Sequence, residues 1–356
     1  MIDVITDCQY GSTGKGALAG WLARKNGPDV LACAFSPNAG HTFIDSDGRT
    51  LVHKMLPLGL TSYYLNTIVH GPGSLLDLDV FVAEVKAARD LGYLQGVQFL
   101  VHENAAVVLD RHREAEANGG TAPGSTRKGC GEAHIERVKR NPSRVNVVGR
   151  ISQDHEFFDL VKLVSTKELQ SVYAKAEHVQ VEGCQGYSLS VYHGQYPYCT
   201  YRDVTTASLL SDCGVPHGMS TQVYGTFRTY PIRVANRPEA GEWSGPAYPD
   251  SKEVTFESIG QKQELTTVTK LPRRIFTFSH TQAEEACAQN GVDVAFLNFA
   301  NYCQTFEELE GLLLSMGEYT DPALVGFGPT IRDLYEVTSR GELKEIYEDY
   351  RSRAAG

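Results

Sequence analysis

Short apolar runs alternate with longer amphipathic segments along this chain. Residues 97–101, 178–182 and 293–299 are brief and rich in branched or aromatic side chains, which indicates buried strands. Residues 78–91 and 305–316 carry apolar side chains at helical spacing, which predicts two amphipathic helices. Strands that are separated by helices are typical of a mostly parallel sheet. We therefore predict an α/β fold in which helices surround a large central sheet, with ligand sites at the carboxyl ends of the strands.

Composition narrows the class of protein. The chain has 356 residues and no linker, repeat or low-complexity tract, so we expect a single domain that spans residues 1–356. Its formal net charge of −10 argues against a nucleic-acid or anionic membrane surface, because such partners require clustered Lys and Arg. The eight Cys residues form no CxxC pair, and no apolar run approaches the length of a membrane span. These features predict a cytoplasmic enzyme with reduced thiols and small-molecule substrates.

Residues 7–16, DCQYGSTGKG, form a glycine-rich link between an apolar strand and a helical segment. Gly11, Gly14 and Gly16 allow the backbone to approach an anion, and Lys15 adds positive charge. Two residues separate the first of these glycines from the Gly-Lys pair, whereas a Walker A loop has four. The segment therefore predicts a phosphate-binding loop that is not an ordinary P-loop. A glycine-rich turn without a ligand is the alternative.

Six sequence blocks, spread in order over nearly the whole chain, resemble those of the adenylosuccinate synthetase family. They are QYGSTGKG (9–16), PNAGHT (37–42), GSTRKG (124–129), EGCQG (182–186), YPYCT (196–200) and FGP (327–329). The resemblance implies the family's fold, with a large central sheet and peripheral helices. It also implies Mg²⁺ as a cofactor, a homodimer as the active unit, and two chemical steps in one cavity. In these steps O6 of the purine attacks the γ-phosphate of the donor, and the amino group of aspartate then displaces phosphate from C6.

The resemblance also implies roles for individual residues. Lys15 would hold phosphoryl oxygens, His41 would act as an acid on the transferring phosphoryl group, and the Gly40 carbonyl would bind Mg²⁺. Arg140 would reach the neighbouring subunit's nucleotide phosphate; a solvated helix face is the alternative for this residue. The nucleotide- and phosphate-binding positions that the family pattern implies are Gly11, Thr13, Gly14, Gly16, Asn38, Ser125, Thr126, Gln185, Thr200 and Val234.

Ser12 is a departure from the family, which has an Asp at this position as general base and magnesium ligand. A hydroxyl cannot replace that base near neutral pH, and loss of a positioned base typically costs about 10²–10⁴-fold in rate. A small Ser leaves space for the 2-amino group of guanine. In this the chain resembles the phage branch of the family, which makes N6-succino-2-amino-2′-deoxyadenylate from dGMP and aspartate. Asp7 is a candidate for a relocated base or metal contact, with loop capping as its alternative, and Ser12 is a second candidate metal ligand.

Residues 297–300, LNFA, predict a change of phosphate donor. Asn298 and Ala300 stand where the family's TKLD block has a Lys and the Asp that reads the guanine of GTP. A methyl group cannot accept those hydrogen bonds, so we expect ATP or dATP as the donor. A shifted alignment, in which Asp293 reads the base, is the alternative. Gly328 and Pro329 are expected to lie beside the donor base.

Residues 268–274, VTKLPRR, resemble the family's aspartate loop. Thr269, Arg273 and Arg274 keep their places, and two guanidinium groups suit the two carboxylates of aspartate. Leu271 replaces an Arg that reaches the ribose in the family, which is compatible with a deoxyribose.

Together these features predict a ligase that joins L-aspartate to C6 of dGMP with hydrolysis of ATP or dATP. An adenylosuccinate synthetase that uses IMP is one alternative. A catalytically degenerate relative that only binds purine nucleotides is another, and the retained Lys15, His41 and arginine pair argue against it.

Overall fold

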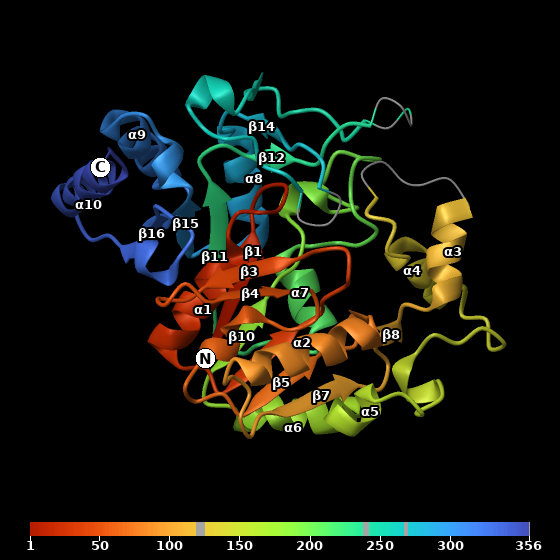
Figure 1. Cartoon of the computed structure of the whole chain (residues 1–356). Helices are drawn as coiled ribbons and strands as arrows, with labels where there is room; N and C mark the ends of the chain where they lie inside the picture. Colours follow the sequence, from red (N-terminus) through yellow and green to blue (C-terminus); the bar gives the residue numbers. More distant parts are fainter. Residues whose placement is uncertain (119–124, 238–240, 242, 267–269, 356) are drawn as a thin grey trace.

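A ten-stranded sheet forms the centre of the computed structural model, which describes residues 1–118, 125–237, 241, 243–266 and 270–355 (Figure 1). The strand order is β17, β16, β15, β11, β1, β10, β2, β5, β7, β9, and all neighbours are parallel except β16 and β17. These strands are β1 (Ile2–Asp7), β2 (Val30–Cys33), β5 (Thr67–His70), β7 (Gln98–His102), β9 (Val161–Val164), β10 (Val179–Glu182), β11 (Thr221–Arg228), β15 (Val294–Asn298), β16 (Asp321–Gly326) and β17 (Leu334–Glu336).

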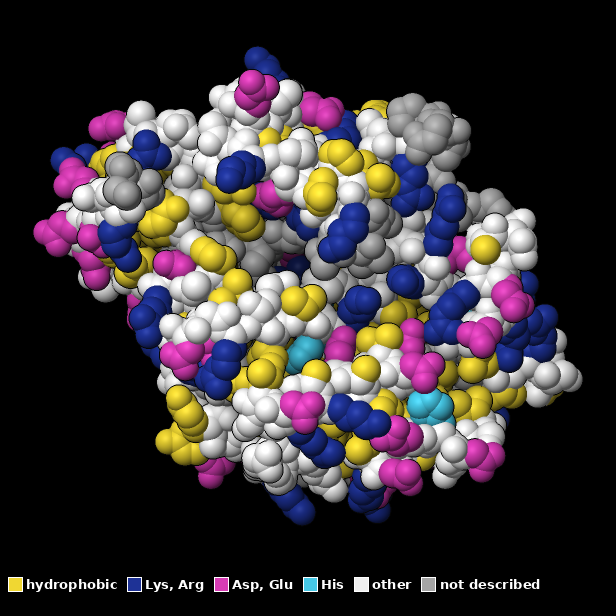
Figure 2. All heavy atoms as spheres, viewed as in Figure 1, with side chains coloured by type: hydrophobic (Ala, Val, Ile, Leu, Met, Phe, Trp, Pro, Cys, Tyr) yellow, Lys and Arg dark blue, Asp and Glu magenta, His cyan; other side chains and the backbone are white. Residues whose placement is uncertain are grey.

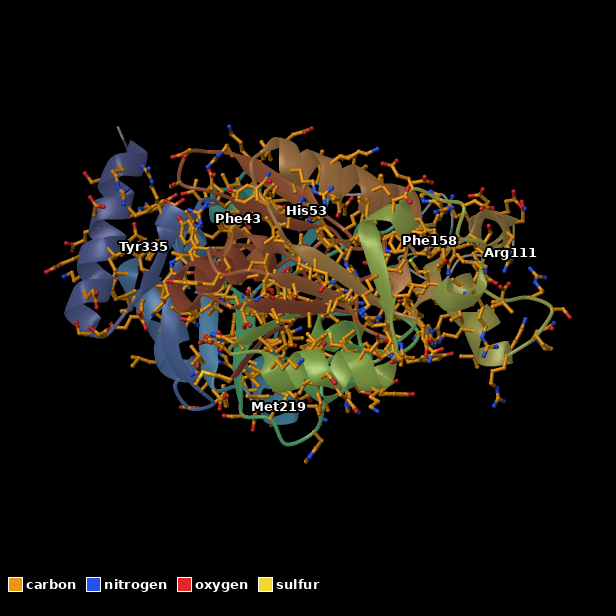
Figure 3. The ribbon with its side chains drawn as sticks, turned by 90° about the horizontal axis from the view of Figure 1, so that it is seen from below. Phe43, His53, Arg111, Phe158, Met219 and Tyr335 are labelled. Carbon is orange, nitrogen blue, oxygen red and sulfur yellow. The ribbon has the colours of Figure 1, made fainter. Side chains whose placement is uncertain are left out.

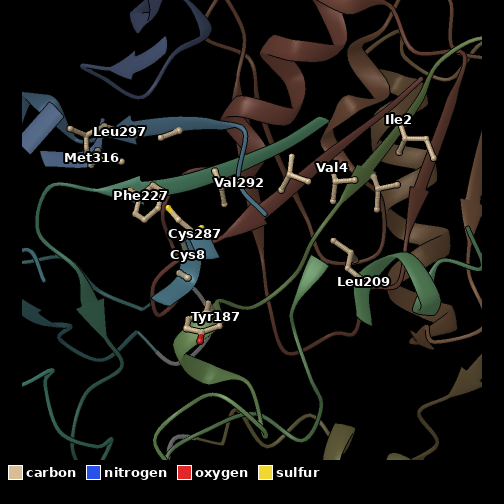
Figure 4. Packing of buried hydrophobic residues seen from close by; sticks show 14 of the residues in the cluster. Ile2, Val4, Cys8, Tyr187, Leu209, Phe227, Cys287, Val292, Leu297 and Met316 are labelled. Carbon is tan, nitrogen blue, oxygen red and sulfur yellow. The ribbon is translucent and has the colours of Figure 1, made fainter. Parts of the chain in front are cut away.

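Helices cover both faces of this sheet. Successive strand residues point to opposite faces, so Val4 and Ile5 of β1 belong to two different apolar clusters. The cluster around Ile5 includes side chains of α1 (Lys15–Asn26), α2 (Leu78–Asp90) and α5 (Phe157–Leu160). The cluster around Val4, part of which is drawn in Figure 4, includes side chains of α6 (Thr166–Lys175), α7 (Thr206–Asp212), α8 (His280–Asn290), α9 (Phe306–Met316) and α10 (Arg340–Ala355). Figure 3 shows α2 and α6 on opposite sides of the sheet.

The predicted α/β architecture is confirmed, and the predicted helices agree with the structure to within a residue or two. Helix α2 begins at Leu78 because the Asp77 carboxylate accepts the N–H of Val80 at 3.3 Å. Helix α9 begins at Phe306, after Thr305 caps it in the same way. No helix in the described part of the chain is both long and apolar enough to cross a bilayer.

The parallel arrangement positions the site. Strands β11, β1, β10 and β2 are neighbours, so their carboxyl ends at Arg228, Asp7, Glu182 and Cys33 lie along one edge. The loops that follow these strands therefore meet there. Smaller elements complete the surroundings: the hairpin of β3 (His41–Ile44) and β4 (Thr50–His53), the pair β6 (Leu75–Leu76) and β8 (Ala106–Val107), helices α3 (Asp110–Asn118) and α4 (Cys130–Lys139), and the sheet of β12 (Ile232–Arg233), β14 (Arg274–Phe276) and β13 (Glu253–Val254).

Candidate active site

A cavity of about 490 Å³ lies at this carboxyl edge. The loops after β1, β2 and β10 line it, together with β12, the segment that follows β12, and segments near α4 and β14. Figure 2 shows Lys and Arg side chains around the hollow at the centre of this face. The cavity brings together most of the residues predicted for the site: Gly11, Ser12, Gly14, Lys15, Gly16, Asn38, Gly40, His41, Ser125, Thr126, Gln185, Thr200, Val234 and Arg273.

Other predicted residues are not among the described lining of this cavity. These are Asp7, Thr13, Arg140, Arg274, Asn298, Gly328 and Pro329, while Thr269 lies outside the described residues. Arg140 is exposed at the end of α4, where it adopts a left-handed φ of 51°. Its proposed reach to a second subunit stays a prediction.

Asp7 supports the glycine-rich loop of residues 7–16 from the side behind the loop. Its Oδ1 accepts the N–H groups of Gln9 at 2.9 Å and Gly11 at 3.1 Å. Its Oδ2 accepts the Thr13 hydroxyl at 2.5 Å and the Lys15 ammonium at 2.8 Å. The Asp7 side chain is 0% exposed. With four donors on one buried carboxylate, these contacts support the loop-capping role, and a role for Asp7 as base stays a prediction.

Ser12 forms the exposed tip of the loop. Its φ of 57° is left-handed, a conformation that costs energy for a residue with a Cβ, and the fully buried Arg228 donates to its carbonyl at 3.4 Å. Gly14 has a φ of 94°, and a Cβ there would lie 2.0 Å from the Asn298 amide nitrogen. That amide donates to the Thr13 carbonyl at 3.3 Å. Asn298 therefore supports the loop from behind and leaves room only for glycine at position 14.

His41 is oriented by a carboxylate that sequence reasoning did not assign. Its Nδ1 lies 2.6 Å from Glu182 Oε1, and the other oxygen of Glu182 accepts the N–H of Leu58 at 2.7 Å. Because Nδ1 is engaged, Nε2 is the nitrogen available to the cavity that His41 lines. His53 pairs with His41 across the hairpin, and burial, with a contribution from His41, lowers the pKa of His53 to about 4. His53 is therefore neutral near pH 7.

The segment expected to hold the 5′-phosphate is organised by Glu116 of α3. Glu116 accepts the Ser125 hydroxyl and the N–H of Gly129, both at 2.5 Å. Gly129 is the left-handed N-cap of α4, and no side chain caps that helix. Arg237 donates to the Ser125 carbonyl at 3.2 Å. Glu116 itself lines the cavity, so its negative charge lies beside Ser125 and Thr126.

A cluster of charged groups forms another wall. Glu264 accepts two hydrogen bonds from Arg228, at 2.6 and 3.4 Å, and one from the Tyr302 hydroxyl at 2.7 Å. Arg273 lies 3.5 Å from the same carboxylate. The Arg228 guanidinium is 3.8 Å from the ring centroid of Phe299. Burial alone would raise the pKa of Glu264, but Arg228, Tyr302 and Arg273 hold it below its usual value, so Glu264 is ionised.

Arg273 and Arg274 were predicted as a pair, and the structure separates them. Arg274 begins strand β14 and forms two hydrogen bonds with Glu253, at 2.8 and 2.6 Å. It also donates to the Ser244 hydroxyl at 2.9 Å and to the Gly245 carbonyl at 2.7 Å. Adjacent residues of an extended segment point in opposite directions, which explains why Arg273 and not Arg274 is among the described lining of the cavity.

Motif reasoning did not assign the charged residues Glu116, Glu182, Arg228 and Glu264 of the site, nor Lys128, Arg233 and Arg237, which also line the cavity. Glu182 stood inside the EGCQG block, so its place beside a catalytic loop could have been noticed. Arg228 could have been noticed as a charged residue at the end of an apolar strand. Glu116 and Glu264 carried no comparable signal in the sequence.

The fold and the cavity together define a nucleotide-binding α/β enzyme of the kind that handles phosphoryl groups, with a glycine-rich loop at the carboxyl edge of a parallel sheet. A family model described as adenylosuccinate synthetase matches residues 4–163 and 158–311. The chain belongs to the adenylosuccinate synthetase family.

Two phage proteins and one solved structure illustrate the similarity. The N6-succino-2-amino-2′-deoxyadenylate synthase of Cyanophage S-2L is 53% identical over 351 residues, which cover 98% of this chain and 96% of that protein. The protein of the same name from Acinetobacter phage SH-Ab 15497 is 43% identical over 366 residues, with 95% and 94% coverage. The structure of Cyanophage S-2L succinoaminodeoxyadenylate synthetase, bound to dGMP and dATP as an energy donor, matches with a TM-score of 0.94 and 53% identity, and the match covers 98% of this chain and 99% of that one.

Proposed function

We propose that this protein joins L-aspartate to C6 of dGMP, with hydrolysis of ATP or dATP, to give N6-succino-2-amino-2′-deoxyadenylate, the nucleoside diphosphate and phosphate. The observation that carries the proposal is the exposed Ser12 at the tip of the glycine-rich loop, a position at which the adenylosuccinate synthetase pattern has an Asp. The small hydroxyl leaves space for a 2-amino group and can accept a hydrogen bond from it. The two phage relatives, which are named N6-succino-2-amino-2′-deoxyadenylate synthase, support the same conclusion.

The reaction takes place in two steps in the cavity. O6 of guanine attacks the γ-phosphorus, the donor leaves as its diphosphate, and the N1 proton passes to solvent water, because the Ser12 hydroxyl is not a base near neutral pH. The amino group of aspartate then attacks C6, and phosphate leaves with the oxygen. Lys15 and the loop N–H groups hold phosphoryl oxygens. His41 acts as an acid through Nε2, since its Nδ1 lies 2.6 Å from Glu182 Oε1.

An adenine nucleotide is the donor in this proposal. The Asn298 amide nitrogen donates to Thr13, and its oxygen accepts the N–H of Phe299 at 2.8 Å. Both ends of this side chain are therefore engaged with the backbone, which supports loss of the guanine reading that the family's GTP users require. The solved relative with dATP as energy donor supports dATP alongside ATP. The positions of Gly328 and Pro329 beside the donor base stay part of the proposal.

Mg²⁺ fits this site as an ion that takes part of its ligands from the phosphates of the substrates. The described residues include no group of three His, Cys, Asp or Glu that could hold a metal. The Gly40 carbonyl and the Ser12 hydroxyl line the cavity, and a hard cation accepts oxygen ligands of this kind. Mg²⁺ usually takes its remaining ligands from phosphate and water, and when bound it neutralises phosphate charge. Gly40 and Ser12 are therefore the residues that would hold it.

The nucleotide and aspartate occupy different walls of the cavity. Ser125, Thr126 and Thr200 hold the 5′-phosphate, and Asn38 and Gln185 contact the base. Arg273 binds a carboxylate of aspartate. The apolar side chains of Val234 and Leu271 lie along a deoxyribose, which needs no partner for a 2′-hydroxyl. A homodimer with Arg140 at the neighbouring site, a single domain and a location in the host cytoplasm complete the proposal.

Phosphate release tests the proposed function. The purified protein is assayed with Mg²⁺, aspartate and ATP or dATP, in parallel with dGMP, GMP and IMP. We expect turnover with dGMP and none with IMP. Turnover with IMP alone would indicate an adenylosuccinate synthetase that uses IMP. No turnover with any nucleotide would favour a catalytically degenerate relative that only binds purine nucleotides.

A variant of the loop tip sharpens this test. Ser12→Asp is expected to lower turnover with dGMP, because a carboxylate crowds the 2-amino group. Ser171→Asp adds the same charge on an exposed position of α6 and is the matched control.

A further inference from the structure

We propose that Glu264 is a positioning residue: it holds the Arg273 guanidinium at the cavity wall, where Arg273 binds a carboxylate of the aspartate substrate. This inference rests on the proposed function, because it assigns the carboxylate of aspartate to Arg273. It adds a residue that no block of the family resemblance assigned and that itself need not touch the substrate.

The backbone brings the two residues together. Segments 264–266 and 271–273 run antiparallel: the Arg273 N–H donates to the Glu264 carbonyl at 2.9 Å, and the Thr266 N–H donates to the Leu271 carbonyl at 2.8 Å. The Arg273 Nε donates to the Leu265 carbonyl at 3.2 Å. Beyond these contacts, Arg273 Nη1 lies 3.5 Å from Glu264 Oε2, so the Glu264 carboxylate acts on the orientation of the guanidinium.

Glu264 is itself fixed from two other elements. Arg228 comes from the end of β11, and its side chain is 0% exposed. Tyr302 comes from the short helix Ala300–Tyr302 that follows β15. Because both donors belong to or directly follow strands of the sheet, the Glu264 carboxylate is a fixed point against which Arg273 is oriented.

The charges in this cluster also suit an anionic substrate. Arg228 and Arg273 share one carboxylate, so the group of three side chains keeps a net charge of +1. A substrate carboxylate at Arg273 is therefore attracted by a net positive charge. Glu264 orients the Arg273 guanidinium but does not neutralise both arginines. Arg228 also donates to the Ser12 carbonyl, so one buried guanidinium contacts both the phosphate loop and the aspartate wall.

The neighbouring arginine provides a matched control. Arg274 is bound by Glu253 through two hydrogen bonds, as Arg228 is by Glu264, but neither Arg274 nor Glu253 is part of the described cavity lining. A Glu→Gln change at position 253 therefore removes the same charge from the partner of the adjacent arginine. If position 264 acts through Arg273, the two changes have different effects on aspartate.

The experiment is steady-state kinetics of Glu264→Gln, Glu264→Asp and Glu253→Gln, with aspartate and dGMP varied in turn. We expect Glu264→Gln to raise the KM for aspartate about tenfold, the usual size for loss of one charge-assisted hydrogen bond, and to leave the KM for dGMP within about twofold. Glu264→Asp keeps the charge that buried Arg228 needs, so it stays folded if the Gln variant does not. It shortens the reach to Arg273, and we expect its KM for aspartate to rise several-fold. Glu253→Gln should match the wild type.

Each outcome distinguishes the inference from the proposed function. Wild-type turnover with dGMP is measured first, and its absence contradicts the proposed function itself. With turnover present, an unchanged KM for aspartate in the folded Glu264 variants overturns the inference. A KM that rises equally for aspartate and dGMP also overturns it, because that result indicates a general structural role.

Discussion

Two carboxylates support the two loops that are proposed to bind phosphate, one from behind its loop and one from within the cavity wall. Asp7 lies behind the loop of residues 7–16, outside the described cavity lining, and its charge is paired with Lys15 at 2.8 Å. Glu116 lies in the cavity wall, where it accepts a hydroxyl from Ser125 and an N–H from Gly129. Both carboxylates order a loop, but Asp7 accepts a hydrogen bond from the Lys15 ammonium, whereas the described donors to Glu116 are the neutral Ser125 hydroxyl and Gly129 N–H.

The difference concerns the effect of each charge on an incoming phosphate. A carboxylate behind the loop, neutralised by Lys15, orders the N–H groups without repelling the anion. A carboxylate in front of the loop orders Ser125 and also repels a phosphate that binds beside it. Neutral substitutions at Asp7 and Glu116 should therefore change substrate binding and turnover in opposite directions.

The largest effect is expected for Asp7→Asn. The change leaves the buried Lys15 without its counter-charge and weakens the contacts to Thr13, and breaking a buried pair costs about 3–5 kcal/mol. We expect turnover to fall by about 10²-fold or more in the phosphate-release assay. Asp3→Asn, at the other end of β1, is the control that loses a buried carboxylate far from the cavity. Full turnover by Asp7→Asn would contradict any role for Asp7 in the loop.

Ser125→Ala should have the next largest effect. It removes a hydroxyl that is proposed to hold the 5′-phosphate and that Glu116 now accepts. A hydrogen bond to a charged group is worth about 1.5–3 kcal/mol, so the KM for dGMP should rise about tenfold or more. Ser143→Ala, on an exposed turn after α4, is the control. An unchanged KM for dGMP would contradict the proposal that Ser125 binds the 5′-phosphate.

Glu116→Gln should act in the opposite direction. The amide keeps a hydrogen-bond acceptor for Ser125 or Gly129 and removes the negative charge from the cavity. We expect the KM for dGMP to fall about fivefold, since a like charge about 4 Å away contributes about 1 kcal/mol where water screens it fully. Glu114→Gln, on an exposed position of the same helix, should leave the KM unchanged. A rise in KM would show that the support Glu116 gives to Ser125 outweighs its repulsion.

The smallest effect concerns the scaffold of the second loop. Arg111 and His112 of α3 pair with Glu136 of α4, and hydrogen bonding from Arg111, against the opposing effect of burial, lowers the pKa of Glu136 to about 2. Because the folded-state pKa lies below the unfolded value of about 4.3, this pair stabilises the fold above that pH and loses its contribution as pH falls toward 2. Glu136→Gln should therefore melt earlier than wild type at pH 7, with a difference that shrinks at pH 3. An equal difference at both pH values would contradict the assignment.

Sequence reasoning worked best for local features. The strand, glycine-rich loop and helix of residues 2–26 follow from short-range periodicity and spacing, and the structure has them as β1 and α1. The capping of α9 by Thr305 and the hairpin turn at Gly48 are also local, and both could be expected from residue type alone.

Sequence reasoning could not predict contacts between residues that are far apart in the chain. His41 and Glu182 are 141 positions apart, and Arg228 and Glu264 are 36 apart, so only the fold brings each pair together. The separation of Arg273 from Arg274 also escaped prediction, because a motif gives the order of residues and not the face on which each lies. Charge alone suggested two equivalent arginines.

Transfer of nitrogen from aspartate to dGMP is the most direct test of the whole account. The protein is incubated with dGMP, ATP or dATP, Mg²⁺ and ¹⁵N-labelled L-aspartate, and the purine product is examined by mass spectrometry. The account predicts a product with the mass of N6-succino-2-amino-2′-deoxyadenylate that carries one ¹⁵N atom. Phosphate release without a labelled product, or a labelled product from IMP and not from dGMP, would contradict it.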